Sequence, residues 1–404
     1  MDNIQDEHPM GAPRHNPAMQ LFRILAFAIY FITSCLFIHF AQLLGLALYP
    51  FTRNWYYAYQ ALCKQYFGLL VTTMTQWFSP TTVRISGDRS IPSQLHQAAD
   101  GSLRVNFPER LILMANHQIY TDWLYLWWIA YTNDPVPTHG HIYIILKESL
   151  RYVPVIGPAM VFYNFIFMAR KWSKDQARLA DRLQKLNTRH SGPLSGSTGG
   201  QQLDPMWLMI FPEGSNLSAN TRRGSAAWAA KQNIPDMSHM LLPRSTGLAF
   251  SLRELHNTVD WVYDITMAYE GIPAQQYGQD VFTLRSVYFQ GRPPKSVNLH
   301  FRRFRVADIP VDDQQAMNSW LLARWREKDE LVEAFMRTGR FPSDKGAVSI
   351  EGGPEDEFKT PFINTEVRPR GVFEFLQMYA PVLGATLVGR IGVQLVDLFT
   401  GVRR

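Results

Sequence analysis

The chain has 404 residues, of which 46% are hydrophobic, 18% are charged and 13% are aromatic. It is long enough for one large domain or two smaller ones, and it carries less charge than an ordinary soluble domain. The formal net charge of +6 favours attraction to anionic surfaces, lipid headgroups or a phosphorylated ligand, but it is too diffuse to indicate nucleic acid. Two cysteines, Cys35 and Cys63, exclude a disulfide framework and a cysteine-based zinc site.

Two apolar segments near the N-terminus predict membrane helices. Residues 1–20 are polar and contain proline, so we predict a disordered tail there. Residues 24–48 contain no Asp, Glu, Lys or Arg, and this run is long enough to cross about 30 Å of hydrocarbon. A cleaved signal peptide is less favoured, because the apolar run is too long and its leader is acidic. Residues 54–79 predict a second, aromatic-rich amphipathic helix that lies against the membrane surface or packs on the first helix, so residues 21–80 are interpreted as membrane-associated helices.

From residue 82 onward, short apolar runs alternate with helix-length segments. The pattern indicates an α/β domain over residues 81–342, with a mixed, largely buried sheet flanked by helices. The predicted strands are 83–85, 111–115, 142–146, 207–211, 264–269 and 297–301.

Three further segments interrupt or follow this domain. Residues 190–205, rich in Gly and Ser, predict a flexible insertion. Residues 343–372 predict a polar linker, and residues 373–404 an apolar, membrane-associated segment. Proline and glycines between 373 and 399 favour a re-entrant or interfacial arrangement there over a clean span.

A His-x4-Asp pattern, His117 and Asp122, lies in the stretch MANHQIYTDWL between two apolar segments. On one regular helix, five residues would place the two side chains about 140° apart, off a common face. The pair therefore cooperates only if His117 lies at a strand-to-helix junction, with Asp122 in the first helical turn. A carboxylate that orients a neutral imidazole makes a base near neutral pH. The alternative interpretation is a polar turn that caps a helix.

The strand at 207–211 is followed by Pro, Glu213, Gly214 and Ser215. These residues bring a carboxylate, a permissive backbone and a hydroxyl to the edge of the sheet. Gly214 would let backbone N–H groups approach an anion or a substrate hydroxyl. A plain strand-to-loop turn is the alternative.

Two other apolar runs end in cationic residues. Arg170 and Lys171 follow the run FIFMA and would suit a phosphate group. The run Leu241-Leu ends in Pro243 and Arg244. A solvated strand end explains either pattern when it is taken alone.

Taken together and in this order, the four loops resemble the glycerolipid acyltransferases of the 1-acylglycerol-3-phosphate acyltransferase type. The branch that contains lysocardiolipin and lysophosphatidylinositol acyltransferases is the most similar. That similarity rests on the segments LKESLRYVPVIG, FIFMARKW, FPEGSNLS, LLPRSTGL, VYDITMAYEG and WLLARWREKDELVEAF, and it covers residues 21–342. Asn216 replaces an arginine found in many relatives, and Pro158 stands where the branch often has an aromatic residue. Both departures leave the acceptor headgroup open.

The resemblance implies a glycerol-3-phosphate acyltransferase-like fold and a membrane-bound O-acyltransferase. Such an enzyme moves a fatty acyl chain from acyl-CoA to the free hydroxyl of a lysophospholipid, here of the lysophosphatidic acid, lysophosphatidylinositol or lysocardiolipin class. It implies His117 as the base and Asp122 as its partner. The implied substrate-binding residues are Asn116, Arg170, Glu213, Gly214, Ser215, Pro243 and Arg244.

The expected partners are acyl-CoA as co-substrate, the lysophospholipid and a lipid bilayer, without a cofactor or nucleic acid. The endoplasmic reticulum is the expected location, with a mitochondrial membrane or a lipid droplet as alternatives. A metal bound by His117, Asp122 and Glu213 is conceivable, but thioester exchange needs none. One rival interpretation is a catalytically inactive lipid-binding or scaffold protein on an acyltransferase fold. The other is a hydrolase that uses the same base on water.

Overall fold

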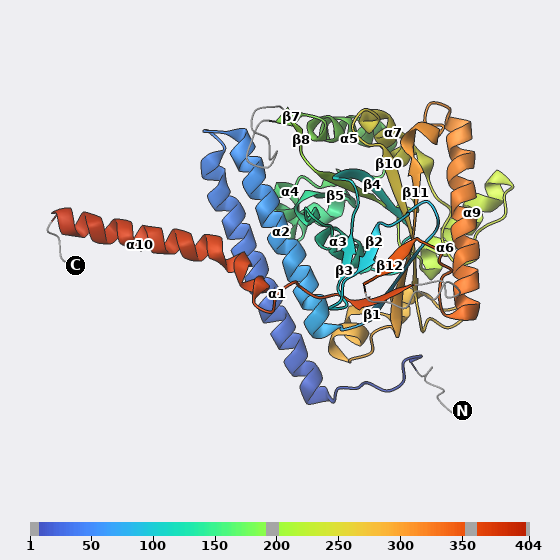
Figure 1. The fold of residues 1–404 in the computed structure, drawn as a ribbon, viewed down its shortest axis with the longest axis horizontal. Coiled ribbons are helices and arrows are strands. Elements are labelled where there is room, and N and C mark those ends of the chain that lie inside the picture. The colour runs from blue at the N-terminus through green and yellow to red at the C-terminus, as the bar shows by residue number, and fades with distance from the viewer. Residues whose placement is uncertain (1–7, 191–201, 352–361, 401–404) are drawn as a thin grey trace.

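A computed structural model describes residues 8–190, 202–351 and 362–400 of the chain (Figure 1). The strands are β1 (Thr82–Gly87), β2 (Leu95–Gln97), β3 (Leu103–Val105), β4 (Arg110–Ala115), β5 (Ile142–Lys147), β6 (Ile166–Met168), β7 (Arg189–His190), β8 (Gln202–Leu203), β9 (Met206–Ile210), β10 (Trp261–Tyr269), β11 (Ser296–Arg305), β12 (Val348–Ile350) and β13 (Ile363–Glu366). The α-helices are α1 (Pro17–Gly45), α2 (Arg53–Phe78), α3 (Asp122–Tyr131), α4 (Ile156–Phe162), α5 (Trp172–Leu186), α6 (Ala219–Gln232), α7 (Ser245–Leu255), α8 (Gly278–Val281), α9 (Gln314–Thr338) and α10 (Ala380–Thr400).

The central sheet has eight strands in the order β13-β1-β11-β10-β4-β9-β5-β6. The strands β10, β4, β9, β5 and β6 run parallel to one another, whereas β11 is antiparallel to β10 and β13 is antiparallel to β1. The mixed α/β architecture and all six predicted strands are thus confirmed. Because β10, β4, β9, β5 and β6 are parallel, the loops that follow them meet at one edge of the sheet.

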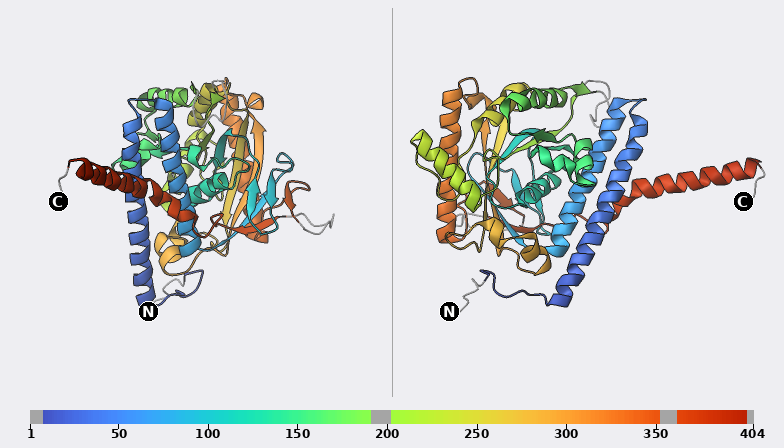
Figure 2. Two further views of the ribbon diagram at one scale, coloured as in Figure 1. Left: turned by 60° about the vertical axis from the view of Figure 1, so that its left-hand side comes forward. Right: turned by 180° about the vertical axis from the view of Figure 1, so that it is seen from behind.

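Alternation along β4 explains how both faces of the sheet are covered. Leu111 and Leu113 join the hydrophobic cluster that includes α2 and α3, whereas Ile112 and Met114 join the cluster formed with α5, α7 and α9. Successive side chains of a strand point to opposite faces, so an uninterrupted apolar strand implies helices on both sides. Figures 1 and 2 show this sandwich, with α9 on the side of the body opposite α1.

The N-terminal helices form a hairpin on one side of the body, and α2 lies between α1 and the sheet (Figure 1). The side chain of Asn16 caps α1 by accepting from the backbone N–H of Met19 at 2.8 Å, and Pro17 occupies the first turn. Residues 17–48 are long and apolar enough to cross a membrane, and only 17% of the most apolar window is buried.

The predicted disordered tail of residues 1–20 is wrong in its described part. His8 Nε2 lies 2.9 Å from the carbonyl oxygen of Val281, and the N–H of Arg14 donates to Gln290 at 3.0 Å. Residues 8–16 therefore lie against the segment that follows β10, and the helix begins at Pro17. Residues 1–7 are outside the described residues.

The C-terminal part differs from the expectation of a linker and a broken apolar segment. Strand β12 pairs with β2, and β13 forms the edge of the central sheet, so residues 343–372 contain parts of two sheets. A short 3-10 helix, η6 (Glu374–Tyr379), then docks on the hairpin, where the hydroxyl of Tyr379 lies 2.7 Å from that of Ser34. The predicted insertion at 190–205 lies mostly outside the described residues, and its ends pair as β7 and β8.

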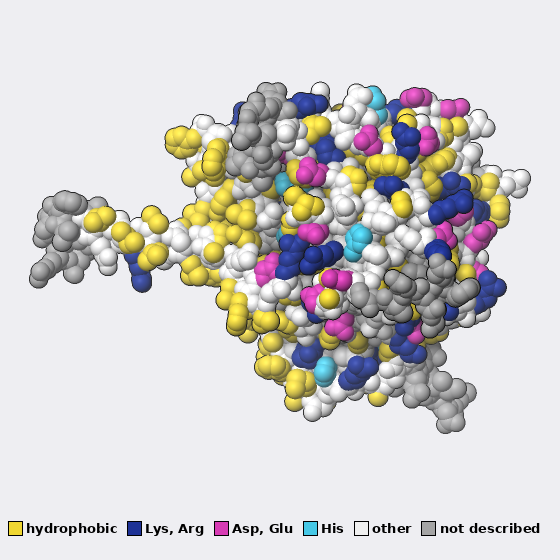
Figure 3. Space-filling view, viewed as in Figure 1, with side chains coloured by type: hydrophobic (Ala, Val, Ile, Leu, Met, Phe, Trp, Pro, Cys, Tyr) yellow, Lys and Arg dark blue, Asp and Glu magenta, His cyan; other side chains and the backbone are white. Residues whose placement is uncertain are grey.

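Helix α10 continues from η6 and projects away from the body as one helix (Figures 1 and 2). Pro381 does not interrupt it, because the second residue of a helix has no intrahelical acceptor for its N–H group. In Figure 3 apolar side chains gather on the side of the body next to the projecting helix and recur along that helix, whereas charged side chains are spread over the rest of the body.

Candidate active site

The junction between β4 and α3 brings His117 and Asp122 together. β4 ends at Ala115 and α3 begins at Asp122, so the intervening turn points both side chains inward. His117 Nδ1 lies 2.8 Å from Asp122 Oδ2. The Asp122 side chain has no exposed surface, whereas that of His117 is 20% exposed. The predicted strand-to-helix junction is confirmed in this geometry.

Both carboxylate oxygens of Asp122 accept hydrogen bonds. Oδ2 also accepts the backbone N–H groups of Gln118 at 2.6 Å and Ile119 at 3.0 Å. Oδ1 accepts the hydroxyl of Tyr269 at 2.5 Å. Burial, and then the charge of Asp122, raises the pKa of Tyr269 well above its usual value, so the phenol remains a donor. A carboxylate with these donors is fixed in place beside the imidazole.

This arrangement leaves the other imidazole nitrogen available. Because Nδ1–H donates to Asp122, Nε2 carries the lone pair of the neutral ring. Within the described part of the chain, no hydrogen bond to Nε2 is formed. The ring of Phe211 stacks on the imidazole with centroids 4.5 Å apart. The pair can therefore act as a general base toward a group that enters from the exposed side.

Glu213 holds the backbone of the histidine. Its Oε1 accepts the N–H of His117 at 3.1 Å, and its Oε2 accepts the N–H of Leu241 at 3.2 Å. Burial raises the pKa of Glu213 to about 8, although the two N–H donors act in the opposite direction. The carboxylate thus ties the loop after β9 to His117 and to the loop before α7. These contacts give Glu213 a positioning role toward His117, and the substrate contact implied by the resemblance stays a prediction.

Asn116 is likewise fully buried and bound to main chain. Its amide N–H donates to the carbonyl oxygen of Met267 at 3.0 Å, and its amide oxygen accepts the N–H of Met267 at 2.8 Å. The side chain thereby extends the pairing of β4 with β10 by one step. Its contacts favour a positioning role over the predicted substrate-binding role.

Arg170 and Gly214 meet at the exposed side of the site. The Arg170 guanidinium donates to the carbonyl oxygen of Gly214 at 2.7 Å, and both residues are exposed. Gly214 has φ +72°, a conformation that glycine adopts freely, and a Cβ there would meet no atom within 4 Å. Glycine is therefore required for its backbone conformation and not for space.

Asp175 fixes the backbone on both sides of Arg170. Arg170 has φ +64°, which is unfavourable for a side chain of its kind. The carboxylate of Asp175, in the first turn of α5, accepts the N–H groups of Ala169 at 2.8 Å and Lys171 at 2.9 Å. Asp175 and Tyr269 are the two residues that sequence reasoning missed. The sequence signal for Asp175 is an acidic residue in a first helical turn, directly after the predicted phosphate loop.

The fourth predicted loop closes the site from the direction of α7. The N–H of Arg244 donates to the carbonyl oxygen of Pro212 at 2.8 Å, which joins this loop to that of Glu213. Pro243 and Ser215 are half-buried, and the side chain of Arg244 is exposed. The structure thus brings the predicted loops to one edge of the sheet.

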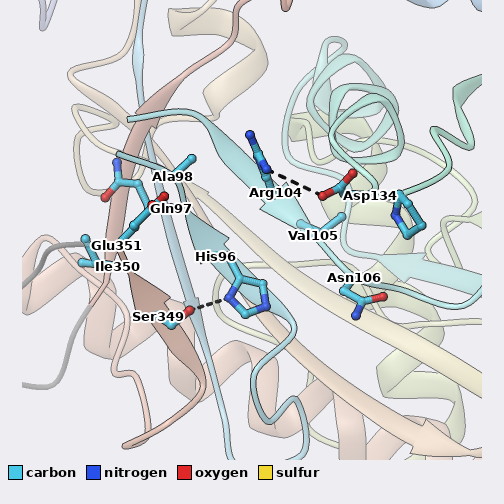
Figure 4. A pocket seen from close by; sticks show the side chains of 11 residues that line it. His96, Gln97, Ala98, Arg104, Val105, Asn106, Asp134, Ser349, Ile350 and Glu351 are labelled. Carbon is cyan, nitrogen blue, oxygen red and sulfur yellow. Dashed lines mark hydrogen bonds and ion pairs between the residues drawn. The ribbon is translucent and has the colours of Figure 1, made fainter. Parts of the chain in front are cut away.

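A separate crevice of about 470 Å³ lies along β2, β3 and β12 (Figure 4). It contains a hydrogen bond of 2.5 Å between His96 and Ser349 and a loose ion pair of 3.9 Å between Arg104 and Asp134. None of the predicted site residues lines it. Among the described residues, no three His, Cys, Asp or Glu side chains are grouped to hold a metal ion.

A His-x4-Asp pair after β4 and a Glu-Gly turn after β9, the neighbour of β4 in a mixed sheet, form the arrangement that the resemblance to acyltransferases implies. Residues 83–270 match the family model described as Acyltransferase, and residues 288–366 match the one described as Acyltransferase C-terminus. The chain belongs to this acyltransferase family.

Relatives in fungi and animals are similar over most of the chain. It is 37% identical to the 2-acyl-1-lysophosphatidylinositol acyltransferase of Saccharomyces cerevisiae, over 78% of this chain and 85% of the relative. It is 36% identical to an uncharacterized acyltransferase of Schizosaccharomyces pombe, over 76% of this chain and 83% of the relative. It is 28% identical to lysocardiolipin acyltransferase 1 of Gallus gallus, over 67% of each chain.

Proposed function

We propose that the protein is a membrane-bound enzyme that transfers a fatty acyl group from acyl-CoA to the free hydroxyl of a lysophospholipid. The observation that carries this proposal is the His117–Asp122 pair, 2.8 Å apart, with Nε2 open at the edge of the sheet that also holds Arg170. A base and a cationic side chain at one edge suit an acceptor that has both a hydroxyl and a phosphate.

The reaction follows from the tautomer that Asp122 fixes. His117 Nε2 accepts the proton of the acceptor hydroxyl as its oxygen attacks the thioester carbonyl carbon. The tetrahedral adduct then collapses, the carbon–sulfur bond breaks, and the proton on Nε2 passes to the departing CoA thiolate. Asp122 stabilises the imidazolium between these steps. The acceptor hydroxyl is itself the nucleophile, so no acyl-enzyme is needed.

Arg170 is proposed to bind the acceptor phosphate. One of its N–H groups donates to Gly214, which leaves other N–H groups of the guanidinium for phosphate oxygens. Asp175 holds the backbone there, so the charge is positioned before the ligand arrives. The similarity to the yeast lysophosphatidylinositol enzyme makes lysophosphatidylinositol the first acceptor to test, ahead of lysophosphatidic acid and lysocardiolipin.

The α1–α2 hairpin is proposed to hold the site at a bilayer, where both acyl chains reside. The outward side of α1 exposes large apolar side chains along its whole length, including Phe22, Ile29 and Phe40. An exposed apolar surface of this extent indicates a membrane or protein contact. We propose the endoplasmic reticulum as the membrane. The rival role of an inactive scaffold does not explain why a buried tyrosine, an aspartate and a histidine are aligned with an open Nε2.

The test is an acyl-transfer assay with the full chain in vesicles, labelled acyl-CoA and a panel of lysophospholipids. We expect transfer to at least one lysophospholipid and its loss in His117→Ala. His256→Ala, an exposed histidine at the end of α7, is the matched control and should retain activity. Absence of transfer to every acceptor, or equal activity in the His117→Ala protein, would overturn the proposed function.

A further inference from the structure

The segment between β5 and the end of α4, residues 147–162, exposes apolar side chains beside the active site. Leu150, Tyr152, Val153 and Val161 are 38%, 74%, 36% and 37% exposed. We call residues 147–162 the β5–α4 segment. After Lys147 it consists of the short 3-10 helix η3 (Glu148–Tyr152), a turn and α4. Large exposed apolar side chains that gather in one segment mark an interaction surface.

The backbone of the segment is held in a strained shape. Val155 has φ 64° and ψ −56°, and the N–H of Ile156 donates to the carbonyl oxygen of Pro154 at 2.7 Å. These values describe a γ-turn of the rarer hand, which is unfavourable for any residue with a Cβ and especially for a β-branched one. Gly157 supports the turn, because a Cβ there would lie 2.2 Å from the carbonyl oxygen of Arg151. Strain of about 1–3 kcal/mol persists where the surroundings fix it, and such positions cluster at functional sites.

The segment packs beside the C-terminal half of α1, through contacts that include the buried Gln42. Gln42 on α1 donates to the carbonyl oxygen of Ala159 at 3.2 Å, and the rings of His39 and Phe162 lie 5.8 Å apart. Helix α4 thus packs against the C-terminal half of α1, and Figure 1 shows α4 beside the hairpin. The exposed side chains of the segment adjoin the surface that we place in the bilayer.

The segment also adjoins the phosphate-binding loop. Lys147, the last residue of β5, is the register partner of Met168, two residues before Arg170. Glu148 pairs with Arg178 of α5 at 2.8 Å, which ties the segment to the helix that positions Arg170. The exposed cations of this region are Lys147, Arg151, Arg170, Lys171 and Lys174. Cations that surround exposed aromatic and aliphatic side chains are typical of surfaces that meet anionic lipid headgroups.

We propose that the β5–α4 segment is a membrane-contact surface, in which Leu150, Tyr152 and Val153 enter the bilayer interface and the neighbouring cations bind lipid phosphates. The bilayer is the one occupant that both features fit, because Tyr is suited to the headgroup level and the cations suit phosphate. The contact places the mouth of the active site against the lipid surface, so an anionic lysophospholipid moves from the membrane to Arg170 without crossing water. The membrane contact rests on the proposed placement of α1, and the delivery of acceptor rests on the proposed reaction.

The contact is tested on the full chain in vesicles by a fluorophore attached at a single position. Cys35 and Cys63 are buried, so a thiol-reactive, environment-sensitive label is directed to Tyr152→Cys. Trp228→Cys is the matched control, since Trp228 is 47% exposed on α6, on the other side of the body from α1. A spin label carried by a phospholipid near its headgroup is the quencher.

We expect quenching at position 152 several times that at position 228, and stronger quenching when phosphatidylinositol is added to phosphatidylcholine vesicles. Equal quenching at both positions would overturn the proposal, and no response to phosphatidylinositol would remove the role of the cations.

A kinetic measurement separates the delivery role from the reaction itself. Tyr152→Ser should raise the apparent KM for a long-chain lysophospholipid embedded in vesicles and leave the KM for a soluble short-chain acceptor unchanged. An equal rise for both acceptors would contradict delivery from the membrane. If no acceptor is acylated, the proposed function fails, while the quenching measurement still decides the membrane contact.

Discussion

Replacing Asp175 by Asn tests whether the left-handed backbone at Arg170 serves phosphate recognition. The carboxylate accepts the N–H groups of Ala169 and Lys171 on either side of Arg170. In Asp175→Asn the amide oxygen keeps one of these hydrogen bonds. The amide NH2 group faces the other backbone N–H, and two donors cannot form a hydrogen bond with each other. The variant therefore loses one hydrogen bond to a charged acceptor, worth about 1.5–3 kcal/mol.

The free energy of the lost hydrogen bond is similar to or larger than the backbone strain at Arg170 that this bond offsets. A residue with a side chain in the left-handed region costs roughly 1–2 kcal/mol. Without the second bond, the loop relaxes to an ordinary conformation and the guanidinium leaves its place beside Gly214. If its contact with the acceptor phosphate is also worth about 1.5–3 kcal/mol, the KM for the lysophospholipid rises by about 10- to 150-fold.

Steady-state kinetics that vary each substrate separately give the measurement. We expect the acceptor KM to rise and the acyl-CoA KM to stay near its wild-type value. Asp181→Asn is the matched control, because Asp181 lies on the same helix, is half-exposed and forms an ion pair with Lys185 in the next turn. An unchanged acceptor KM in Asp175→Asn, despite a lower Tm, would refute a role for this backbone in phosphate binding.

Four other predictions follow from the site and the fold. His117→Ala should lower kcat by about 10²–10⁴-fold while the protein still accumulates in membranes; more than a tenth of wild-type activity would remove His117 from the mechanism. Tyr269→Phe leaves an oxygen of the buried Asp122 without its donor, at a cost of about 1.5–3 kcal/mol, so kcat and Tm should both fall, and wild-type values would show that the phenol does not support Asp122. The pKa of Glu213 is raised from 4.5 to about 8, so between these pH values the folded state binds a proton that the unfolded state releases, and stability should fall as pH rises from 4.5 to 8. The Tm of Glu213→Gln in detergent should therefore depend less on pH than that of the wild-type protein. The same pH dependence of Tm in both proteins would contradict this. Because α1 exposes a continuous apolar side, washing membranes with alkaline carbonate should not release the protein, and full release would contradict its insertion.

The local parts of the site could be predicted from the sequence. An apolar strand followed within seven residues by an apolar helix places the polar residues between them at a strand end, so the positions of His117 and Asp122 follow from the pattern alone. Glu213 and Arg170 follow from the same rule applied to later strands. Tyr269 could not be identified in this way. It lies 147 residues after Asp122, at the end of β10, where the sequence pattern indicates only a buried aromatic residue.

The structures that the sequence did not predict depend on distant pairing or on the absence of packing. β2, β3 and β12 have three residues each, too few for an alternating pattern, and β12 pairs with β2, a strand far earlier in the chain. β13 was also not predicted, because it is short, pairs with the distant β1 and lies in a stretch interpreted as a polar linker. Helix α10 continues through its glycines, because each glycine costs only about 1 kcal/mol in a helix and the leucines of α10 are good helix formers.

The strand order has a consequence for how the protein is made. β1 has β11 and β13 as its only neighbours in the sheet, and β11 begins at Ser296. At a synthesis rate of about 5–20 residues per second, the strand that ends at Gly87 waits roughly 10–40 s for its first partner. During that interval Val83 and Ile85 lack their neighbouring strands in the sheet, whereas the two helices of the α1–α2 hairpin can already pack together. A ribosome that stalls before residue 296 therefore leaves a chain whose central sheet is unfinished, with an unpaired strand edge that other nascent chains can bind.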